Sequence, residues 1–108
     1  MRVLKGTTTF NGVKLSKTGG QHGTDLFYAD PERAQMGGSV MGVVFSAPKA
    51  KTVYVAGDTV WRPEVDQALA QHKPDVVILN TGSALVSGFE EHPIIMGKQD
   101  TLQATKAA

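Results

Sequence analysis

A strand, a helix and a second strand follow one another in residues 52–79, and this pattern constrains the fold more than any other. Thr52 to Ala56 is a short apolar run typical of a buried strand. Residues 63–73 then place apolar side chains every three to four positions, with a proline in the first turn, as a helix allows. Val76 to Leu79 is apolar on both faces and follows a helix-stopping proline. We therefore predict a right-handed βαβ unit with two parallel strands.

The rest of the chain predicts antiparallel strands on one side of this unit. Thr7 to Phe10 and Val13 to Lys17 flank Asn11-Gly12, the dipeptide that favours a type I′ hairpin turn. Ser39 to Ser46 is a second apolar run, and only a short turn separates it from the strand at Thr52. Because so short a connection joins antiparallel neighbours, we expect a mixed sheet.

Two other segments carry weaker patterns. Residues 24–38 show no firm period, and their proline and glycines predict a surface excursion. Met96 to Ala108 favours a helix but has no stop signal, so we expect that the chain is cut short there.

The composition excludes several classes of function. A chain of 108 residues allows one domain with a modest core, and 41% hydrophobic residues is ordinary for a globular protein. The net charge of +1 comes with scattered lysines, which argues against a nucleic-acid binder. No cysteine is available for a disulfide, a thiolate metal site or a nucleophile. Met1 to Gly6 turns polar too quickly for a signal peptide, so we expect a cytoplasmic protein.

Polar residues follow both strands of the βαβ unit. Asp58 comes directly after the first strand and Asn80 after the second. Ligands of parallel α/β sheets bind beyond the carboxyl ends of strands, so we expect these residues side by side. Asp58 could bind a cation or act as a base; alternatively, Asp58 or Thr59 caps the following helix. Asn80 could orient a substrate or simply bond loop backbone.

Three histidines are present, and they differ in setting. His22 lies in the loop Gly19-Gly-Gln-His-Gly23, where small neighbours allow close approach of a metal or substrate; the alternative is a solvent-exposed loop histidine. Together with Asp58 it offers the nitrogen and oxygen donors that zinc-like ions accept. His72 suits a helix C-terminus. His92 lies in the loop after the second strand end, so it could reach the same site; the alternative is a structural or solvent-exposed histidine.

The other polar candidates are weaker. Asp25 and Asp30 are interpreted as solvated or turn carboxylates. Neither Ser83 nor Ser87 lies in a Gly-x-Ser-x-Gly elbow, which argues against a serine hydrolase. No P-loop or Gly-x-Gly-x-x-Gly motif opens a helix either.

Four segments together resemble the metallo-β-lactamase superfamily, and specifically its hydrolase branch that includes the L-ascorbate-6-phosphate lactonases. They are Thr18-Gly-Gly-Gln-His-Gly-Thr-Asp25, Val55-Ala-Gly-Asp-Thr-Val-Trp61, Ile78-Leu-Asn-Thr-Gly82 and Pro93-Ile-Ile-Met-Gly97. Their order and spacing are similar to the C-terminal half of such a protein. Residues 1–108 would then be a single partial domain: an α/β fold, half of an αββα sandwich, with a mixed sheet and helices on one face.

The resemblance also implies a chemistry. Family members bind one or two metal ions, commonly zinc or manganese, which activate a hydrolytic water. His22 matches the metal-binding histidine that follows the N-terminal half, and Asp58 matches the aspartate that bridges two metals. We take Asn80 and His92 as candidate substrate-binding residues and assign no catalytic residue.

The chain also departs from the family pattern. The His-x-His-x-Asp-His signature and the final metal-binding histidine are both absent, and a zinc site needs three or four protein ligands. We therefore expect weak metal binding or none by this chain alone. Two functions of different class follow: a truncated metal-dependent hydrolase that is inactive as a monomer, or a stand-alone half-domain that forms a homodimeric assembly or binding module. The expected partner is accordingly a missing N-terminal half or a second copy.

Overall fold

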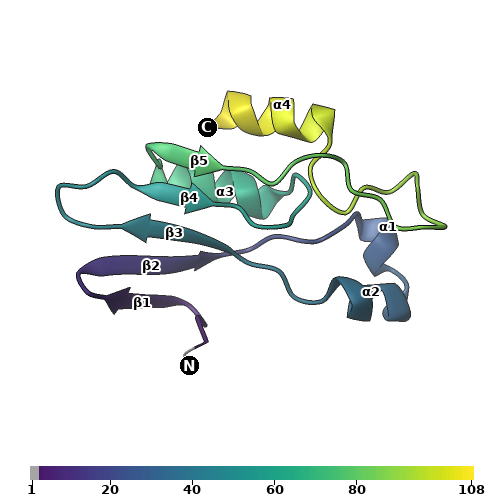
Figure 1. The fold of residues 1–108 in the computed structure, drawn as a ribbon, viewed down its shortest axis with the longest axis horizontal. Helices are drawn as coiled ribbons and strands as arrows, with labels where there is room; N and C mark the ends of the chain where they lie inside the picture. The colour runs from purple at the N-terminus through teal and green to yellow at the C-terminus, as the bar shows by residue number, and fades with distance from the viewer. Residues whose placement is uncertain (1–2) are drawn as a thin grey trace.

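A five-stranded mixed sheet with four helices forms the fold (Figure 1). The computed structural model describes residues 3–108, so Met1 and Arg2, the start of the N-terminal segment considered above, lie outside it. The strands are β1 (Thr7–Phe10), β2 (Val13–Thr18), β3 (Gly42–Ser46), β4 (Val53–Val55) and β5 (Val76–Ile78). The helices are α1 (Asp25–Tyr28), α2 (Pro31–Gly37), α3 (Pro63–His72) and α4 (Lys98–Ala107). The predicted α/β class is confirmed.

The sheet order is β1-β2-β3-β4-β5, and the pairing follows the predictions. The hairpin turn between β1 and β2 holds Asn11 at φ 48° and Gly12 at φ 79°, the positive angles of a type I′ turn. β3 pairs antiparallel with β4, and β4 pairs parallel with β5 through the α3 crossover. Both the hairpin and the βαβ unit are therefore confirmed.

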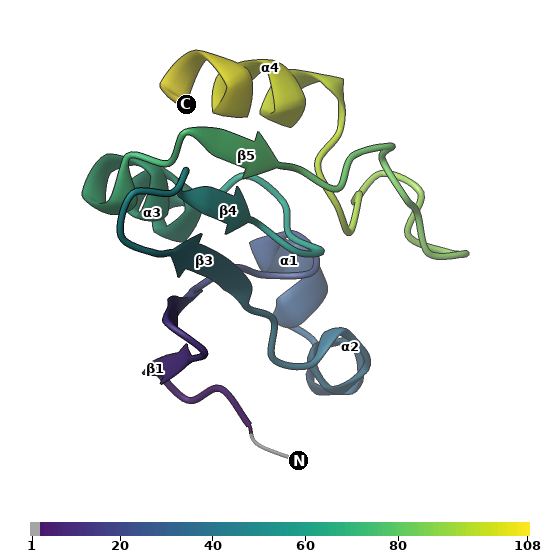
Figure 2. The same ribbon diagram turned by 60° about the vertical axis from the view of Figure 1, so that its left-hand side comes forward.

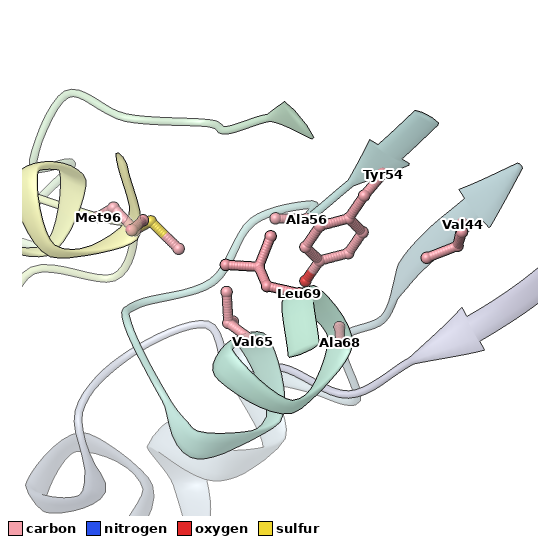
Figure 3. Close-up of a cluster of buried hydrophobic side chains, with 8 residues drawn as sticks. Val44, Tyr54, Ala56, Val65, Ala68, Leu69 and Met96 are labelled. Carbon is pink, nitrogen blue, oxygen red and sulfur yellow. The ribbon is translucent and has the colours of Figure 1, made fainter. Parts of the chain in front are cut away.

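The core lies between one face of the sheet and helix α3. Val44 of β3 and Tyr54 of β4 pair across the sheet and point at α3, which contributes Val65 and Leu69 (Figure 3). Met96, which is 1% exposed, joins this cluster from the segment before α4. Burying such side chains is worth about 1.5–3 kcal/mol each. The cluster thereby fixes α3 and the segment before α4 to the sheet.

Strand direction brings several loops to one edge of the sheet. β2, β4 and β5 all run in the same direction, because β3 is antiparallel to both β2 and β4. Their carboxyl ends meet at the edge where α1, α2 and the loop after β5 gather (Figures 1 and 2). The His22 loop, Asp58 and Asn80 follow these three strands directly.

The opposite face of the sheet is apolar and open. Two rows of apolar side chains cross it in register. The first row is Leu15, Phe45, Val53 and Val76, and the second is Val43, Val55 and Ile78. Val76 is 43% exposed and Ile78 47%. The strand is apolar on both faces as predicted, but within residues 3–108 nothing covers this side of β5.

The surface excursion predicted over residues 24–38 has regular structure that the sequence pattern did not indicate. Two short helices occupy this segment, and each begins at a side-chain cap. Thr24 Oγ1 accepts a hydrogen bond from Phe27 N at 3.3 Å, and Asp30 accepts from Glu32 N and Arg33 N, both at 3.0 Å. Because these caps satisfy amides that a short helix leaves unpaired, the helices form without an amphipathic period. Asp30 is thus a helix cap rather than a turn residue.

Neither Asp58 nor Thr59 caps the helix of the βαβ unit. The N-cap of α3 is Arg62, which makes no side-chain capping bond, and Pro63 takes the first helical position. Since Pro63 has no N–H, it removes one of the donors that a cap would satisfy. The capping interpretation of Asp58 is therefore wrong, and its carboxylate is free for another partner.

No helix formed by residues 3–108 has the length and apolar character that a membrane span requires.

Candidate functional site

Asp58 and Asn80 are joined by a hydrogen bond. Asn80 Nδ2 donates to Asp58 Oδ1 at 2.6 Å, and both side chains are exposed at the carboxyl ends of adjacent parallel strands. The predicted adjacency of these loops is confirmed. The alternative in which Asn80 bonds loop backbone is not what the structure has, because its amide orients a carboxylate instead.

The His22 loop is attached to the Asp58 loop through their neighbours. Gln21 N donates to Thr59 Oγ1 at 2.9 Å, and Val60 N donates back to Gln21 O at 3.0 Å. His22 and Asp58 each lie one residue from this pair. The structure therefore brings the loops that carry the two predicted metal ligands together.

A second set of bonds holds the main chain of His22. Its N–H donates to the Tyr28 hydroxyl of α1 at 3.3 Å, and that hydroxyl donates to Gly38 O at 3.1 Å. His22 itself is half-buried rather than fully exposed. The loop is thus held from both sides, by α1 and by the loop after β4.

An ionic cluster lies beside the loop. Arg62 Nη1 bonds Asp25 Oδ1 at 2.5 Å, and Arg62 Nε bonds Glu64 Oε2 at 3.1 Å. The Gln21 side chain also donates to Asp25 Oδ1 at 3.0 Å. The hydrogen bond from Gln21 and the contact with Arg62 lower the pKa of the Asp25 carboxyl. Asp25 is thus an ion-pair partner as well as a solvated residue, and it links the His22 loop to the start of α3.

His92 lies in the loop after β5, and its own contacts are local. Its N–H donates to Phe89 O at 3.0 Å. The Phe89 ring meets Phe27 of α1 edge-on at 6.1 Å, and the Arg33 guanidinium of α2 lies 4.1 Å from the Phe89 ring centroid. These contacts hold the loop after β5 against α1 and α2. The substrate role of His92 stays a prediction.

The assignment of His22 and Asp58 as metal ligands stays a prediction. His22 and Asp58 supply an imidazole nitrogen and a carboxylate oxygen, which suit zinc or manganese. Structural and catalytic zinc sites take three or four protein ligands. Within residues 3–108 no three His, Cys, Asp or Glu side chains come together in a way that could hold a metal ion. This chain alone therefore does not complete such a site.

A hollow of about 590 Å³ lies behind the candidate site, at the start of α4. Trp61, Arg62, Ser83 and Lys98 are among its lining residues, whereas His22, Asp58 and Asn80 are not. The hollow is therefore separate from the strand ends that carry the candidate donors.

Several residues that build the site were missed in the sequence. Thr59, Gln21, Arg62 and Phe89 act through contacts between distant parts of the chain: 38 positions separate Gln21 from Thr59, 37 separate Asp25 from Arg62, and 62 separate Phe27 from Phe89. Only the helix-cap pattern at Thr24, a threonine directly before a helical turn, was a local signal that could have found α1.

Comparison with known proteins finds relatives among the UPF0173 proteins, one of which is named a metal-dependent hydrolase. No family model matches it. It is 36% identical over 108 residues to the UPF0173 protein YddR of Bacillus subtilis, of which it covers 40%. It is 34% identical over 77 residues, or 71% of this chain, to a UPF0173 metal-dependent hydrolase of Ruegeria pomeroyi, of which it covers 32%. The chain is therefore related to UPF0173 metal-dependent hydrolases and spans at most about 40% of the length of these relatives.

Two crystal structures match the fold closely. One is an isothiocyanate hydrolase from Delia radicum gut bacteria, with 44% identity and a TM-score of 0.89. The other is a possible metal-dependent hydrolase from Veillonella parvula, with 45% identity and a TM-score of 0.92. Each match covers 98% of this chain and 40% of the solved chain. The sheet and helices described above thus correspond to part of the structure of a possible metal-dependent hydrolase.

Proposed function

We propose that this chain forms the part of a metal-dependent hydrolase that contributes His22 and Asp58 to the metal centre, and that it is inactive alone. One observation carries the proposal: the loops bearing both donors are bonded together at one edge of the sheet through Gln21 and Thr59. The likeness to solved structures that include a possible metal-dependent hydrolase supports it.

The remaining ligands would come from a segment that corresponds to the other part of the longer relatives. In a metallo-β-lactamase-like sandwich, that segment would supply a His-x-His-x-Asp-His motif and a second sheet. The metal, zinc or manganese, would lower the pKa of bound water toward neutrality when held by the full ligand set. The role of this chain's residues is to present one nitrogen and one oxygen donor in a fixed relation.

Asn80 and His92 are the candidate residues on the substrate side. Asn80 holds Asp58 at the strand ends, and His92 lies in the loop that Phe89 fixes to α1 and α2. One solved relative is named an isothiocyanate hydrolase. Isothiocyanates therefore join lactones and phosphodiesters as the substrate classes to test.

Metal content and turnover test this proposal directly. The purified chain should contain well under one zinc or manganese per molecule and should not hydrolyse a panel of isothiocyanates, lactones and phosphodiesters. Sequencing the DNA that flanks the coding region should find a frame encoding His-x-His-x-Asp-His, and adding that polypeptide should produce metal-dependent turnover. Stoichiometric, tightly bound zinc in the chain alone would contradict the proposal.

A stand-alone homodimeric half-domain is the second candidate, and the open apolar face favours it. Two copies could pack face to face, as sheets do in sandwiches, and bury the exposed Val76 and Ile78 side chains. Light scattering should then give a dimer that dissociates when both are replaced by Thr. Leu102→Thr, which alters an exposed residue of α4, is the control and should leave the dimer intact. A monodisperse monomer of the native chain would exclude this candidate.

A further inference from the structure

We propose that Thr59 is the positioning residue of the candidate metal centre: its hydroxyl sets the place of the His22 loop relative to Asp58. The inference rests on the proposed function, in which His22 and Asp58 are the donors. Thr59 itself is one residue away from Asp58 and would act through the main chain of Gln21 rather than on the metal.

Three chain segments meet at Thr59. Its side chain is fully buried, with 0% exposure. The hydroxyl accepts a hydrogen bond from Gln21 N at 2.9 Å and donates one to Val60 O at 2.8 Å. The main-chain oxygen of Thr59 accepts from Met96 N at 3.1 Å. The loop after β2, the loop after β4 and the segment before α4 are therefore fixed to one another at this residue.

The His22 loop also packs against Thr59 closely enough to leave little room for a side chain at Gly20. A β-carbon added at Gly20 would lie 3.0 Å from Thr59 Oγ1 and 3.1 Å from Thr59 Cβ. Such distances are shorter than ordinary van der Waals contact. Gly20 and Gln21 thus rest directly on Thr59, and His22 is the next residue along the chain.

Positioning matters here because the chain has only two candidate donors. Ordering the residues of a flexible loop costs conformational entropy, and a site with two donors has few bonds to offset that cost. A loop held in place beforehand avoids that cost when a ligand binds. A threonine at this position supplies both a hydroxyl for the Gln21 amide and a methyl group for the core.

Three substitutions separate the hydroxyl from the rest of the side chain. Thr59→Val keeps the shape and removes the hydroxyl, whereas Thr59→Ser keeps the hydroxyl. Thr18→Val is the matched control, because Thr18 is also buried, at 8% exposure, but its Oγ1 has no hydrogen-bond partner among the described residues. All three are made in the full chain.

Amide hydrogen exchange, measured by NMR, gives the first readout. Thr59→Val should speed exchange of the Gln21 N–H by roughly tenfold, the loss expected for one hydrogen bond of about 1–1.5 kcal/mol. Thr59→Ser and Thr18→Val should exchange at close to the native rate. An unchanged Gln21 rate in Thr59→Val would overturn the proposal.

Titration with Mn²⁺ gives a readout that a purely structural role would not move. The ion should broaden the His22 imidazole signals before those of His72, which lies at the far end of α3. Thr59→Val should raise the Mn²⁺ concentration for half-broadening by roughly tenfold, the lower end for residues that orient metal ligands. Thr59→Ser should restore the native value, and equal values in Thr59→Val and the native chain would contradict the role assigned to Thr59.

The two proposals can fail separately. If Mn²⁺ broadens His22 no more than His72 in the native chain, His22 does not bind the ion without the missing ligands, and the proposed function is then decided by adding the other polypeptide, while the exchange rates still decide whether Thr59 fixes the loop. If Thr59→Val does not fold, Gly20→Ala tests the same contact, because its β-carbon would lie against the Thr59 hydroxyl. It should also speed Gln21 exchange, and a native rate in that variant would overturn the proposal.

Discussion

Asn80 Nδ2 donates a hydrogen bond to Asp58 Oδ1 at 2.6 Å, across the carboxyl ends of two adjacent parallel strands. The amide restricts the direction in which the carboxylate can point. Because both side chains are exposed, solvent competes with this bond, and its value lies more in orientation than in stability.

Removing this amide should weaken metal binding. We expect Asn80→Ala to raise the Mn²⁺ concentration that half-broadens the Asp58 side-chain signals by about tenfold, since partners that orient metal ligands contribute this much. Ser87→Ala, an exposed substitution in the same loop, serves as the control. Equal titration curves for Asn80→Ala and the native chain would show that Asn80 does not orient the ligand.

The Asp25 carboxyl should make stability depend on acid pH. The bond from Gln21 and the Arg62 contact lower its pKa below the ordinary value of 3.8 in the folded state. A lowered pKa gives stability that is present above the unfolded value and is lost as the pH falls through the folded value.

Urea unfolding at a series of pH values measures this effect. Asp25→Asn should lessen the loss of stability as the pH falls below about 4, where the unfolded carboxyl gains its proton. Glu91→Gln, at an exposed loop residue, should leave the native pH dependence unchanged. A native pH profile in Asp25→Asn would mean that the ion pair has no energetic role.

Gly57, directly before Asp58, should tolerate no side chain. It has φ 76°, and an added β-carbon would lie 2.6 Å from Met41 O. Gly57→Ala should lower the free energy of unfolding by roughly 2–4 kcal/mol, from the positive φ together with the overlap. Gly12 has a similar φ of 79° and open space around it, so Gly12→Ala should lower the free energy of unfolding, measured with urea, by only about 1–2 kcal/mol. Equal losses in the two variants would show that the overlap with Met41 O does not contribute.

The two tyrosines should respond oppositely to loss of their hydroxyls. Tyr54 is fully buried, and its hydroxyl makes no hydrogen bond within the described residues. Tyr54→Phe should therefore leave stability unchanged or raise it by up to about 1 kcal/mol. Tyr28→Phe removes bonds to His22 N and Gly38 O and should cost about 1–2 kcal/mol. Thermal unfolding distinguishes them, and a loss in Tyr54→Phe would reveal an unseen partner.

Local patterns were enough to predict the hairpin, the βαβ unit and the adjacency of Asp58 and Asn80. Asn11-Gly12 determines its own turn, and parallel strands necessarily end at the same edge. The short helices α1 and α2 were missed because caps at Thr24 and Asp30, rather than a periodic apolar face, define them.

The attachment of the His22 loop could not be predicted in this way. It depends on Thr59, 38 positions from Gln21, and on a hydroxyl whose partner is a main-chain amide. Every residue except proline has a main-chain amide, so nothing in the amino-acid sequence marks the Gln21 N–H as the donor to the Thr59 hydroxyl. The same holds for Phe89, whose contacts with Phe27 and Arg33 join separate loops.

The order of the strands in the sheet sets the distances between the residues of the candidate site. β4 and β5 are direct neighbours, and their spacing of about 4.8 Å lets Asp58 and Asn80 touch. β3 separates β2 from β4, so the strand before His22 ends roughly 10 Å from the strand before Asp58. Metal ligands at about 2.0–2.2 Å from one ion need their donor atoms within roughly 4 Å of each other. The loop from Gly19 to Gln21 must therefore span the end of β3, and inserting or deleting one residue there would displace His22 by about 3.5 Å, nearly the full distance between two donors of a single ion.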